Sequence, residues 1–225
     1  MKEIWLSPSD LSYFWSDSKI GFYDKYVLGI QRPRQPFPSV FNSIDLAMKS
    51  DFDNKSCSKI VAEAPDGILR HKELFVKSKM IDLKDFRVGF SGKMDCLMDH
   101  GDGFHSVIDY KTTKYSEKLI DIYFLQLMAY AYCLENPLNG DPKHIRGLGL
   151  LVFDPNKFSH KSEKGSLGGK MHWVDIPFDK AKFKHWLTKE LNPLLHSKRE
   201  LIEVSKNDQM WENYVANYDV SEQVE

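Results

Sequence analysis

The stretch GFSGKMDCLMDHGDGFHSVIDYKTT, residues 89–113, predicts two antiparallel strands joined by a tight turn. Asp102-Gly103 is a strong turn signal, and HSVIDYK, residues 105–111, is typical of a returning strand. Between residues 87 and 99, apolar and polar side chains alternate with a period of two, as on a strand with one buried face. The apolar positions are Val88, Phe90, Met94, Cys96 and Met98, and the polar ones are Arg87, Ser91, Lys93, Asp95 and Asp99.

The turn brings two carboxylates together. Pairing about residue 102 places Asp95 directly opposite Asp109, and Lys111 lies on the same face as Asp109 because side chains alternate along a strand. Opposed like charges destabilise a hairpin, so we expect a cation between them. Two carboxylates and a backbone carbonyl are hard oxygen ligands that suit Mg²⁺ or Mn²⁺. Such an ion polarises a phosphoryl oxygen and lowers the pKa of bound water, and the lysine would orient that water or stabilise charge on the phosphate.

A plainer interpretation of the hairpin stays open. Asp95 and Asp109 can be solvated strand residues with Lys111 as their salt-bridge partner, because D-x-K is a short and common pattern.

The composition limits the class of protein. The chain has 225 residues, 42% of them hydrophobic and 28% charged, which suits one globular domain. Its 31 basic and 32 acidic residues nearly cancel, so a surface that binds nucleic acid must be local. The three cysteines are far apart and form no C-x-x-C pair, which argues against disulfides and against zinc or iron–sulfur clusters. The N-terminus turns polar too early for a signal peptide and the longest apolar run is too short for a membrane span, so we expect a soluble cytoplasmic protein.

Other segments predict helices and strands around the hairpin. Ser7 and Pro8 are expected to begin an aromatic-rich helix that runs to about Gly29, followed by a proline-broken connector. The remaining expectations are helices at 39–50 and 115–135, strands at 147–153 and 171–178, a long polar loop at 154–170, and a helical region at 179–204 interrupted near Pro193. The last twenty residues show no clear pattern.

Four motifs follow one another between about residues 5 and 135: LSPSDLSYFWSDSKIGFYDKYVLGI, GKMD, VIDYKTT and QLMAYAYCL. Together they resemble the PD-(D/E)xK nuclease superfamily, and specifically its branch with the RecB nuclease domain and the CRISPR-associated RecB-type exonucleases. The resemblance implies an α/β fold, a single domain over residues 1–225 with a central mixed β-sheet flanked by helices, as in the restriction-endonuclease-like core. Its parts would be an N-terminal helical part (1–65), a catalytic core (66–178) and a C-terminal helical part (179–225).

The resemblance also implies roles for single residues of the hairpin. Asp95 and Asp109 would bind the metal ion, the carbonyl of Tyr110 would complete the metal site, and Lys111 would be the catalytic lysine. The predicted catalytic residues are therefore Asp95, Asp109 and Lys111.

Three further residues match the family pattern outside the hairpin. Gln126 and Tyr130, one helical turn apart, would face the site and the nucleic-acid backbone. Glu73, in HKELFVKS, matches an upstream strand glutamate near the metal. The ordinary alternatives are a satisfied buried amide for Gln126, a core residue for Tyr130 and an exposed strand residue for Glu73.

The sequence departs from the family pattern at two places. Asp45, in FNSIDLAMK, stands where the family usually has a metal-binding histidine; an aspartate ligates Mg²⁺, but it leaves the metal preference open, and the residue can also be an exposed helix residue. Ser16 and Asp17 stand where the first cysteine of the iron–sulfur members is expected. We therefore expect Mg²⁺ or Mn²⁺ as the cofactor and no iron–sulfur cluster.

The expected loop at 154–170 is a candidate for contact with nucleic acid. Lys157, Lys161 and Lys164 would track phosphates, although a flexible solvated loop is the plainer reading. Lysines of KAKFKHW add weaker evidence. Aromatic residues near the N-terminus, Tyr13 among them, would stack bases or, as such sets more often do, form core.

These features lead to one functional expectation and two rivals. The first is a Mg²⁺- or Mn²⁺-dependent deoxyribonuclease, an exonuclease rather than an endonuclease, that acts on single- or double-stranded DNA with free ends in recombination or repair. It would act in the cytoplasm of a bacterium or a virus-infected host cell, and no membrane partner is expected. The sequence does not indicate its oligomeric state. The rivals are a catalytically weakened nucleic-acid-binding module of the same fold, and an unrelated α/β protein whose hairpin carries a surface ion cluster.

Overall fold

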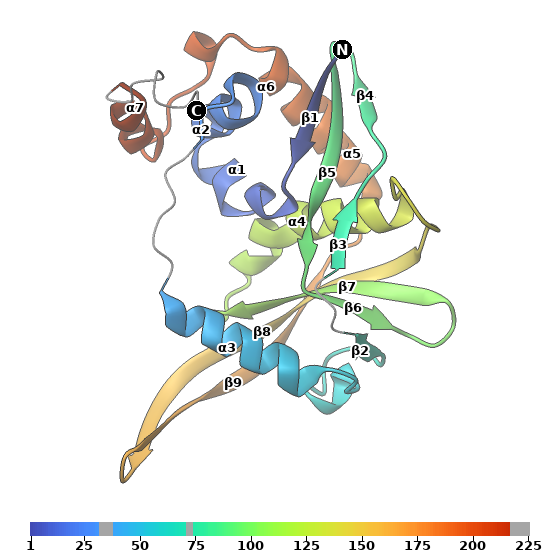
Figure 1. Ribbon diagram of the computed structural model, residues 1–225, viewed down its shortest axis with the longest axis vertical. Coiled ribbons are helices and arrows are strands. Elements are labelled where there is room, and N and C mark those ends of the chain that lie inside the picture. Colours follow the sequence, from blue (N-terminus) through green and yellow to red (C-terminus); the bar gives the residue numbers. More distant parts are fainter. Residues whose placement is uncertain (32–37, 71–73, 217–225) are drawn as a thin grey trace.

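The computed structural model describes residues 1–31, 38–70 and 74–216, in which two mixed β-sheets are flanked by helices (Figure 1). The predicted α/β class is confirmed, with two sheets in place of one central sheet. The first sheet has the order β1-β5-β3, with β4 also paired to β5; its strands are β1 (Lys2–Leu6), β3 (Leu74–Lys77), β4 (Ile81–Leu83) and β5 (Phe86–Met94). The second has the order β2-β6-β7-β8-β9; its strands are β2 (Ile68–Arg70), β6 (Cys96–Asp99), β7 (Phe104–Thr112), β8 (His144–Lys161) and β9 (Lys164–Ile176).

Asp95 is the residue at which the chain passes from the first sheet to the second. The single strand expected over 87–99 is divided there into β5 and β6. Met94 pairs with Leu74 in the first sheet, whereas Cys96 pairs with Ile108 in the second. The period-two alternation continues across the bend, so the sequence pattern gives no sign of it. As a result Asp95 belongs to neither strand, and its side chain does not have to lie on a face of either sheet.

The predicted register of the hairpin is confirmed. Cys96 pairs with Ile108 and Asp99 with His105, as pairing about residue 102 requires. On its other side β7 runs parallel to β8, with Lys111 beside Val152. β7 is therefore a central strand, and its last residues extend past the first residue of β6.

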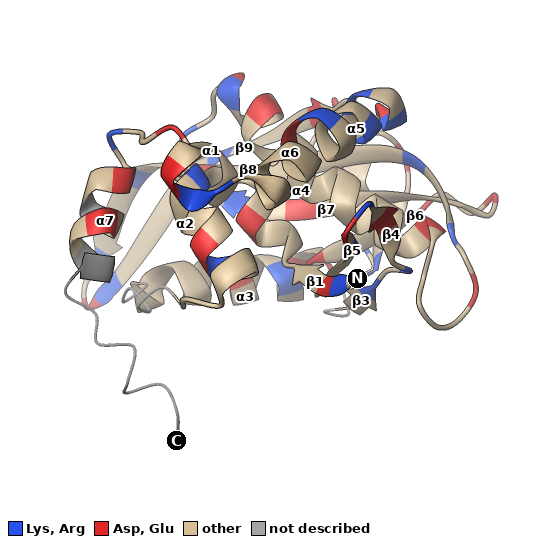
Figure 2. Ribbon diagram, turned by 90° about the horizontal axis from the view of Figure 1, so that it is seen from above, with Lys and Arg blue, Asp and Glu red and all other residues tan. Residues whose placement is uncertain are grey.

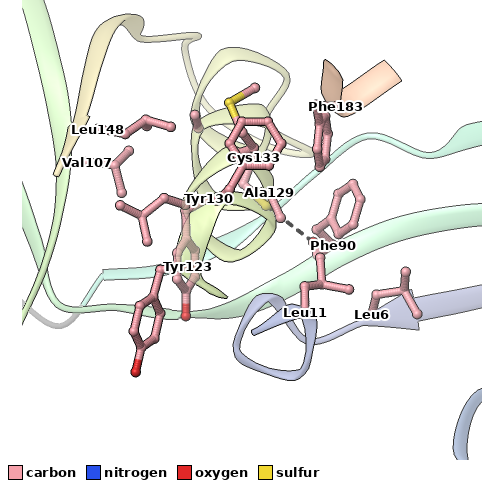
Figure 3. Packing of buried hydrophobic residues seen from close by; sticks show 14 of the residues in the cluster. Leu6, Leu11, Phe90, Val107, Tyr123, Ala129, Tyr130, Cys133, Leu148 and Phe183 are labelled. Carbon is pink, nitrogen blue, oxygen red and sulfur yellow. Dashed lines mark hydrogen bonds between the residues drawn. The ribbon is translucent and has the colours of Figure 1, made fainter. Parts of the chain in front are cut away.

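Helix α4 (Lys118–Glu135), expected from its helical spacing, lies at the centre of the larger hydrophobic core. This core joins the helix to strands of both sheets, and Figure 3 shows Phe90 of β5 and Leu148 of β8 on either side of it. The thiol of Cys133 donates to the carbonyl oxygen of Phe90 at 3.6 Å. α4 is thus fixed against the strand that leads into Asp95.

A smaller core lies under α3 (Ser39–Phe52), the second expected helix. Met48 of α3 packs there with Ile108 and Tyr110 of β7. Because successive side chains of a strand point to opposite faces, Asp109 faces α4 while its two neighbours face α3. Strand β7 is thereby held between the two helices.

Residues 154–170 form a β-hairpin arm, so the expectation of a polar loop is wrong. β8 continues to Lys161, Ser162 turns the chain with φ of 54°, and β9 returns from Lys164. Figure 1 shows the arm projecting past α3. Both faces of the arm are largely exposed, so its side chains need no apolar alternation, and the backbone ladder between β8 and β9 supplies the pairing.

The N-terminal segment contains a strand that no sequence pattern indicated, because β1 is short and pairs in parallel with the distant β5. Ser7 and Pro8 begin a helical turn as expected, but the expected single helix is broken at Ser18, whose hydroxyl accepts the N–H of Gly21. Gly29 ends the segment with φ of 79°, a conformation that glycine adopts without strain. The helical pieces are η1 (Pro8–Leu11), α1 (Tyr13–Asp17), α2 (Lys19–Tyr23), the π-turn η2 (Asp24–Leu28) and, after α3, η3 (Cys57–Lys59). The expected connector lies mostly outside the described residues.

The C-terminal helical region continues through Pro193 and is not interrupted there as expected. Proline lacks the N–H that an α-helical turn needs, and a π-turn directly before it accommodates the loss. α7 forms where no pattern was expected, and Trp211 anchors it by donating to Asp24 Oδ2 at 2.8 Å. The pieces are α5 (Lys180–Trp186), η4 (Leu187–Leu191), α6 (Asn192–His196), η5 (Arg199–Leu201) and α7 (Asp208–Ala216). Within the described part of the chain, no helix has both the length and the apolar character needed to cross a membrane.

Candidate active site

The end of β7 borders an open pocket of about 490 Å³ between α1, α3 and α4. Lys111 and Thr112 reach it from β7, Asp95 from the bend, and Asp45 from α3. The pocket is lined by Tyr13, Phe41, Asn42, Asp45, Asp95, Tyr110, Lys111, Thr112, Thr113 and Tyr123. Residues from five separate segments therefore meet where the predicted catalytic strand ends.

Asp109 is buried behind this pocket, with 4% of its surface exposed. Its Oδ1 accepts a hydrogen bond from Gln126 Nε2 at 3.1 Å, and its Oδ2 pairs with the ammonium group of Lys111. Burial raises the pKa of Asp109, and the nearby Asp95 carboxylate raises it further, although Lys111 opposes the shift. The reading of Asp109 as a solvated strand residue is excluded by this burial.

Asp95 has a different environment from Asp109. Its Oδ2 accepts the backbone N–H of Tyr110 at 3.2 Å, and its Oδ1 lies 2.9 Å from Lys49 Nζ. Burial alone would raise the pKa of Asp95, but the charges of Lys111 and Lys49 and the Tyr110 hydrogen bond outweigh burial and hold the pKa below its usual range. Asp95 is thus a carboxylate, already held by cations.

Lys111 is held as an ammonium group between acidic and aromatic neighbours. Burial would lower the pKa of Lys111, but Asp109 and Asp95 raise it above its ordinary value. Its Nζ lies 4.9 Å from the ring centroid of Tyr123, a favourable position for a cation. The lysine therefore faces the pocket with its charge in a fixed place.

Asp45 lines the pocket and is linked to Asp95 through Lys49. Lys49 Nζ lies 2.8 Å from Asp45 Oδ2 and 2.9 Å from Asp95 Oδ1, so one ammonium group bridges the two carboxylates. The two acidic side chains raise the pKa of Lys49 even though burial acts in the opposite direction. Sequence reasoning missed Lys49; its spacing of four from Asp45 signals a helical ion pair, but nothing local signals its contact with Asp95.

Gln126 and Tyr130 lie on the face of α4 that packs against the site. Both are buried, and the Tyr130 hydroxyl donates to the carbonyl of Lys93 at 2.5 Å, beside the bend. Direct contact of these two side chains with nucleic acid does not fit their burial; the structure instead gives them positions that fix Asp109 and the bend. Glu73 lies outside the described residues.

The site offers oxygen donors of the type that binds a divalent metal ion. Asp95 and Asp109 offer carboxylate oxygens, and the Tyr110 carbonyl points to the same edge of β7 as its N–H, toward Asp95. Over residues 1–31, 38–70 and 74–216, no three acidic, histidine or cysteine side chains are arranged to hold a metal. The ammonium groups of Lys49 and Lys111 lie among the carboxylates and partly neutralise their charge.

The arm places its lysines on one face. Lys161 of β8 pairs with Lys164 of β9, and Lys157 precedes Lys161 by four residues on β8. Because side chains alternate along a strand, the three lysines share a face with Ser159 and Ser166. Phe158 and Leu167 pair on the opposite face, where Phe158 is 73% exposed. The root of the arm is tied to the segment after β7, since Tyr115 N–H donates to Asp154 Oδ2 at 3.1 Å.

Comparison with known proteins yields one family and a distant structural likeness. The family model of the PD-(D/E)XK nuclease superfamily matches residues 40–210. A solved structure described as "Crystal structure of SSO0001" resembles this one with a TM-score of 0.49 and 14% sequence identity, over 86% of this chain and 77% of that chain. No curated protein matches the sequence.

Proposed function

The chain belongs to the PD-(D/E)XK nuclease superfamily, and we propose that it is a divalent-metal-dependent deoxyribonuclease that acts on DNA with free ends. Membership indicates a metal-dependent nuclease with a nucleic-acid substrate; DNA and the requirement for ends are our proposal. The observation that carries it is the meeting of Asp95, Asp109 and Lys111 beside one open pocket. The three residues come from a strand bend and the end of the neighbouring strand.

Asp95, Asp109 and the Tyr110 carbonyl would hold Mg²⁺ or Mn²⁺, which supplies positive charge for a phosphoryl oxygen and lowers the pKa of bound water. Gln126 fixes the Asp109 carboxylate through its hydrogen bond. Tyr130 fixes the bend through the Lys93 carbonyl. The rigid helix α4 thus sets the position of both acidic residues.

Lys111 would act on the phosphate during hydrolysis, when water adds to phosphorus and one P–O bond breaks. Its ammonium group stabilises the negative charge that develops on the phosphate oxygens. Because Asp109 and the Tyr123 ring already hold this group, little reorganisation is needed when the charge develops. Tyr13, 46% exposed at the pocket, is placed to stack on a base of the bound strand.

The arm would bind the DNA backbone next to the pocket. The net charge of the chain is −1 and Figure 2 shows acidic and basic residues interspersed over the helices, so binding needs a local cationic surface. The face with Lys157, Lys161 and Lys164 is such a surface, and its serines add hydrogen-bond donors. Exposed Phe158 on the opposite face suits stacking on an unpaired base.

An exonuclease is our preferred form of this activity. The support is the resemblance of the first 135 residues to RecB-type enzymes, which act on DNA ends, and on the same ground we propose a role in recombination or repair. The test is degradation of labelled linear, circular and single-stranded DNA with Mg²⁺, with Mn²⁺ and with chelator. Loss of linear DNA while circular DNA persists supports an exonuclease. Equal cleavage of both contradicts the need for ends, and no cleavage of any substrate with metal contradicts the proposal.

A second candidate is a nucleic-acid-binding module with weakened catalysis. The observation that favours it is Asp45 in place of the family histidine, with Lys49 across Asp45 and Asp95. DNA binding by wild type without cleavage, under every metal condition, would support this candidate over the nuclease.

A further inference from the structure

Lys49 occupies the position between the carboxylates of the site. Its ammonium group contacts one oxygen of Asp45 and one oxygen of Asp95, and only 15% of the Lys49 side chain is exposed. An ammonium group that bridges two carboxylates reduces the repulsion between them, as a metal ion at the same place would.

We propose that Lys49 is a built-in counter-ion of the metal-free protein, and that a divalent cation must displace its ammonium group from Asp95 to bind. This inference rests on the proposed function, because it concerns the metal site of the same nuclease.

Both carboxylate oxygens of Asp95 have partners in the metal-free protein. Asp95 Oδ1 contacts Lys49, and Asp95 Oδ2 accepts the Tyr110 N–H, so each oxygen of this carboxylate already has a partner. A divalent ion bound about 2.1 Å from Oδ1 would lie close to the Lys49 ammonium group, and two cations at that separation repel one another strongly.

The charges around Asp95 also favour release of the lysine when a metal ion binds. Among the described residues, the carboxylates of Asp45, Asp95 and Asp109 face the ammonium groups of Lys49 and Lys111. Adding a divalent ion to this group would place a third cation beside the two ammonium groups in a partly buried place. Departure of Lys49 would reduce the repulsion between these cations, so binding of the ion and release of the lysine are coupled.

Lys49 also has a route out. The adjacent Met48 and, one turn on, Phe52 bury α3 against the smaller core, so the helix itself is anchored. Asp45 is partly exposed and lines the open pocket, so the flexible side chain of Lys49 would rotate toward this pocket while the helix stays in place. Lys111 differs because its ammonium group is held by the Asp109 carboxylate and the Tyr123 ring.

The first experiment titrates MnCl₂ into wild type and Lys49→Met, with thermal unfolding and calorimetry as readouts and no DNA. We expect Lys49→Met to bind Mn²⁺ about tenfold more tightly, the factor that corresponds to about 1.4 kcal/mol. Lys55→Met is the matched control: Lys55 pairs with Asp51 at 2.9 Å with the same spacing of four, away from the pocket, and its loss should leave the Kd unchanged. Equal affinity of wild type and Lys49→Met overturns the inference.

The second experiment uses wild type alone, and it stands if Lys49→Met fails to fold. Amines are acetylated with and without MnCl₂, and labelling is quantified for each lysine by mass spectrometry. We expect labelling of Lys49 to rise several-fold with Mn²⁺, labelling of Lys55 to stay constant, and Asp109→Asn to show no rise. Mn²⁺ binding without increased labelling overturns the displacement of Lys49 and leaves the nuclease proposal intact. Absence of Mn²⁺ binding in wild type and Lys49→Met overturns both.

Discussion

Gln126 Nε2 lies 3.1 Å from Asp109 Oδ1, so a helix 17 residues farther along the chain holds the most buried carboxylate of the site. The amide is buried on helix α4, which lies at the centre of the larger core, and it fixes the direction of the Asp109 oxygens. A buried carboxylate has few alternatives to such a partner, because an unsatisfied acceptor costs about 1–3 kcal/mol or more.

Gln126→Met keeps the volume of the side chain and removes this hydrogen bond. We expect DNA cleavage to fall about 10- to 100-fold, as when an outer partner of a metal ligand is lost, and DNA affinity to change little. Cleavage rates over a Mn²⁺ titration, with DNA binding measured in chelator, check this. Cleavage at the wild-type rate at every Mn²⁺ concentration would show that Asp109 needs no support from α4.

Lys111→Met should remove the positive charge that acts on the phosphate. We expect cleavage to fall by roughly 10²–10³ while DNA binding and the fold persist, because the group acts in the transition state and not in ground-state affinity. Single-turnover cleavage and thermal unfolding separate the two effects, with Lys55→Met as the control that should cleave normally. Wild-type cleavage by Lys111→Met would contradict the catalytic role of the hairpin.

The hairpin was predictable because its signals are local. Alternation, the Asp102-Gly103 turn and side-chain period fix the register that brings Asp95 and Asp109 together. The bend at Asp95 was not predictable, since apolar residues keep their alternation on both sides of it while packing in different cores. The bend depends on contacts with residues far along the chain, which the local sequence does not reveal.

The same contrast applies to the site and the arm. Lys111 could be predicted from its spacing to Asp109, whereas Lys49 reaches Asp95 only because α3 packs against β7. The arm lacks apolar alternation because neither of its faces is buried, so a sequence rich in lysine, serine and glycine reads as a loop.

Replacing Lys157, Lys161 and Lys164 together by alanine should weaken DNA binding and its dependence on salt. Each lost phosphate contact lowers the slope of log affinity against log salt by about 0.9 for duplex DNA. Binding measured over a salt series checks this. The matched control replaces Lys180, Lys182 and Lys184 of α5, whose loss should leave the slope unchanged. An equal decrease in both variants would assign the effect to total charge and not to the arm.

Asp109→Asn should change how the stability of the metal-free protein depends on pH. The folded state raises the pKa of Asp109, chiefly through burial, so ionising this group disfavours the fold. Its contribution is neutral below about pH 4, where the carboxyl is protonated in both states; the free energy of unfolding then falls as the pH rises toward the raised pKa, and the loss is complete above it. Asparagine does not titrate, so the free energy of unfolding of the variant should not show this decrease. Unfolding of both proteins over a pH series in chelator checks this. The same pH dependence of stability in both proteins would mean that the raised pKa belongs to another group.

At pH 7, Mn²⁺ should make wild type more stable than Asp109→Asn, which reverses the order of their stabilities without metal. An ion that binds only the folded state at ~100 times its Kd stabilises wild type by about 2.7 kcal/mol, which for a domain of this size raises Tm by roughly 5–11 °C. Asp109→Asn loses one anionic ligand and should gain little, although its metal-free form is at least as stable as wild type. Melting curves with chelator and with Mn²⁺ decide the point. A variant that gains as much as wild type would mean that Asp109 and Asp95 do not share a metal, since the ion would then depend on Asp95 and Asp45 alone.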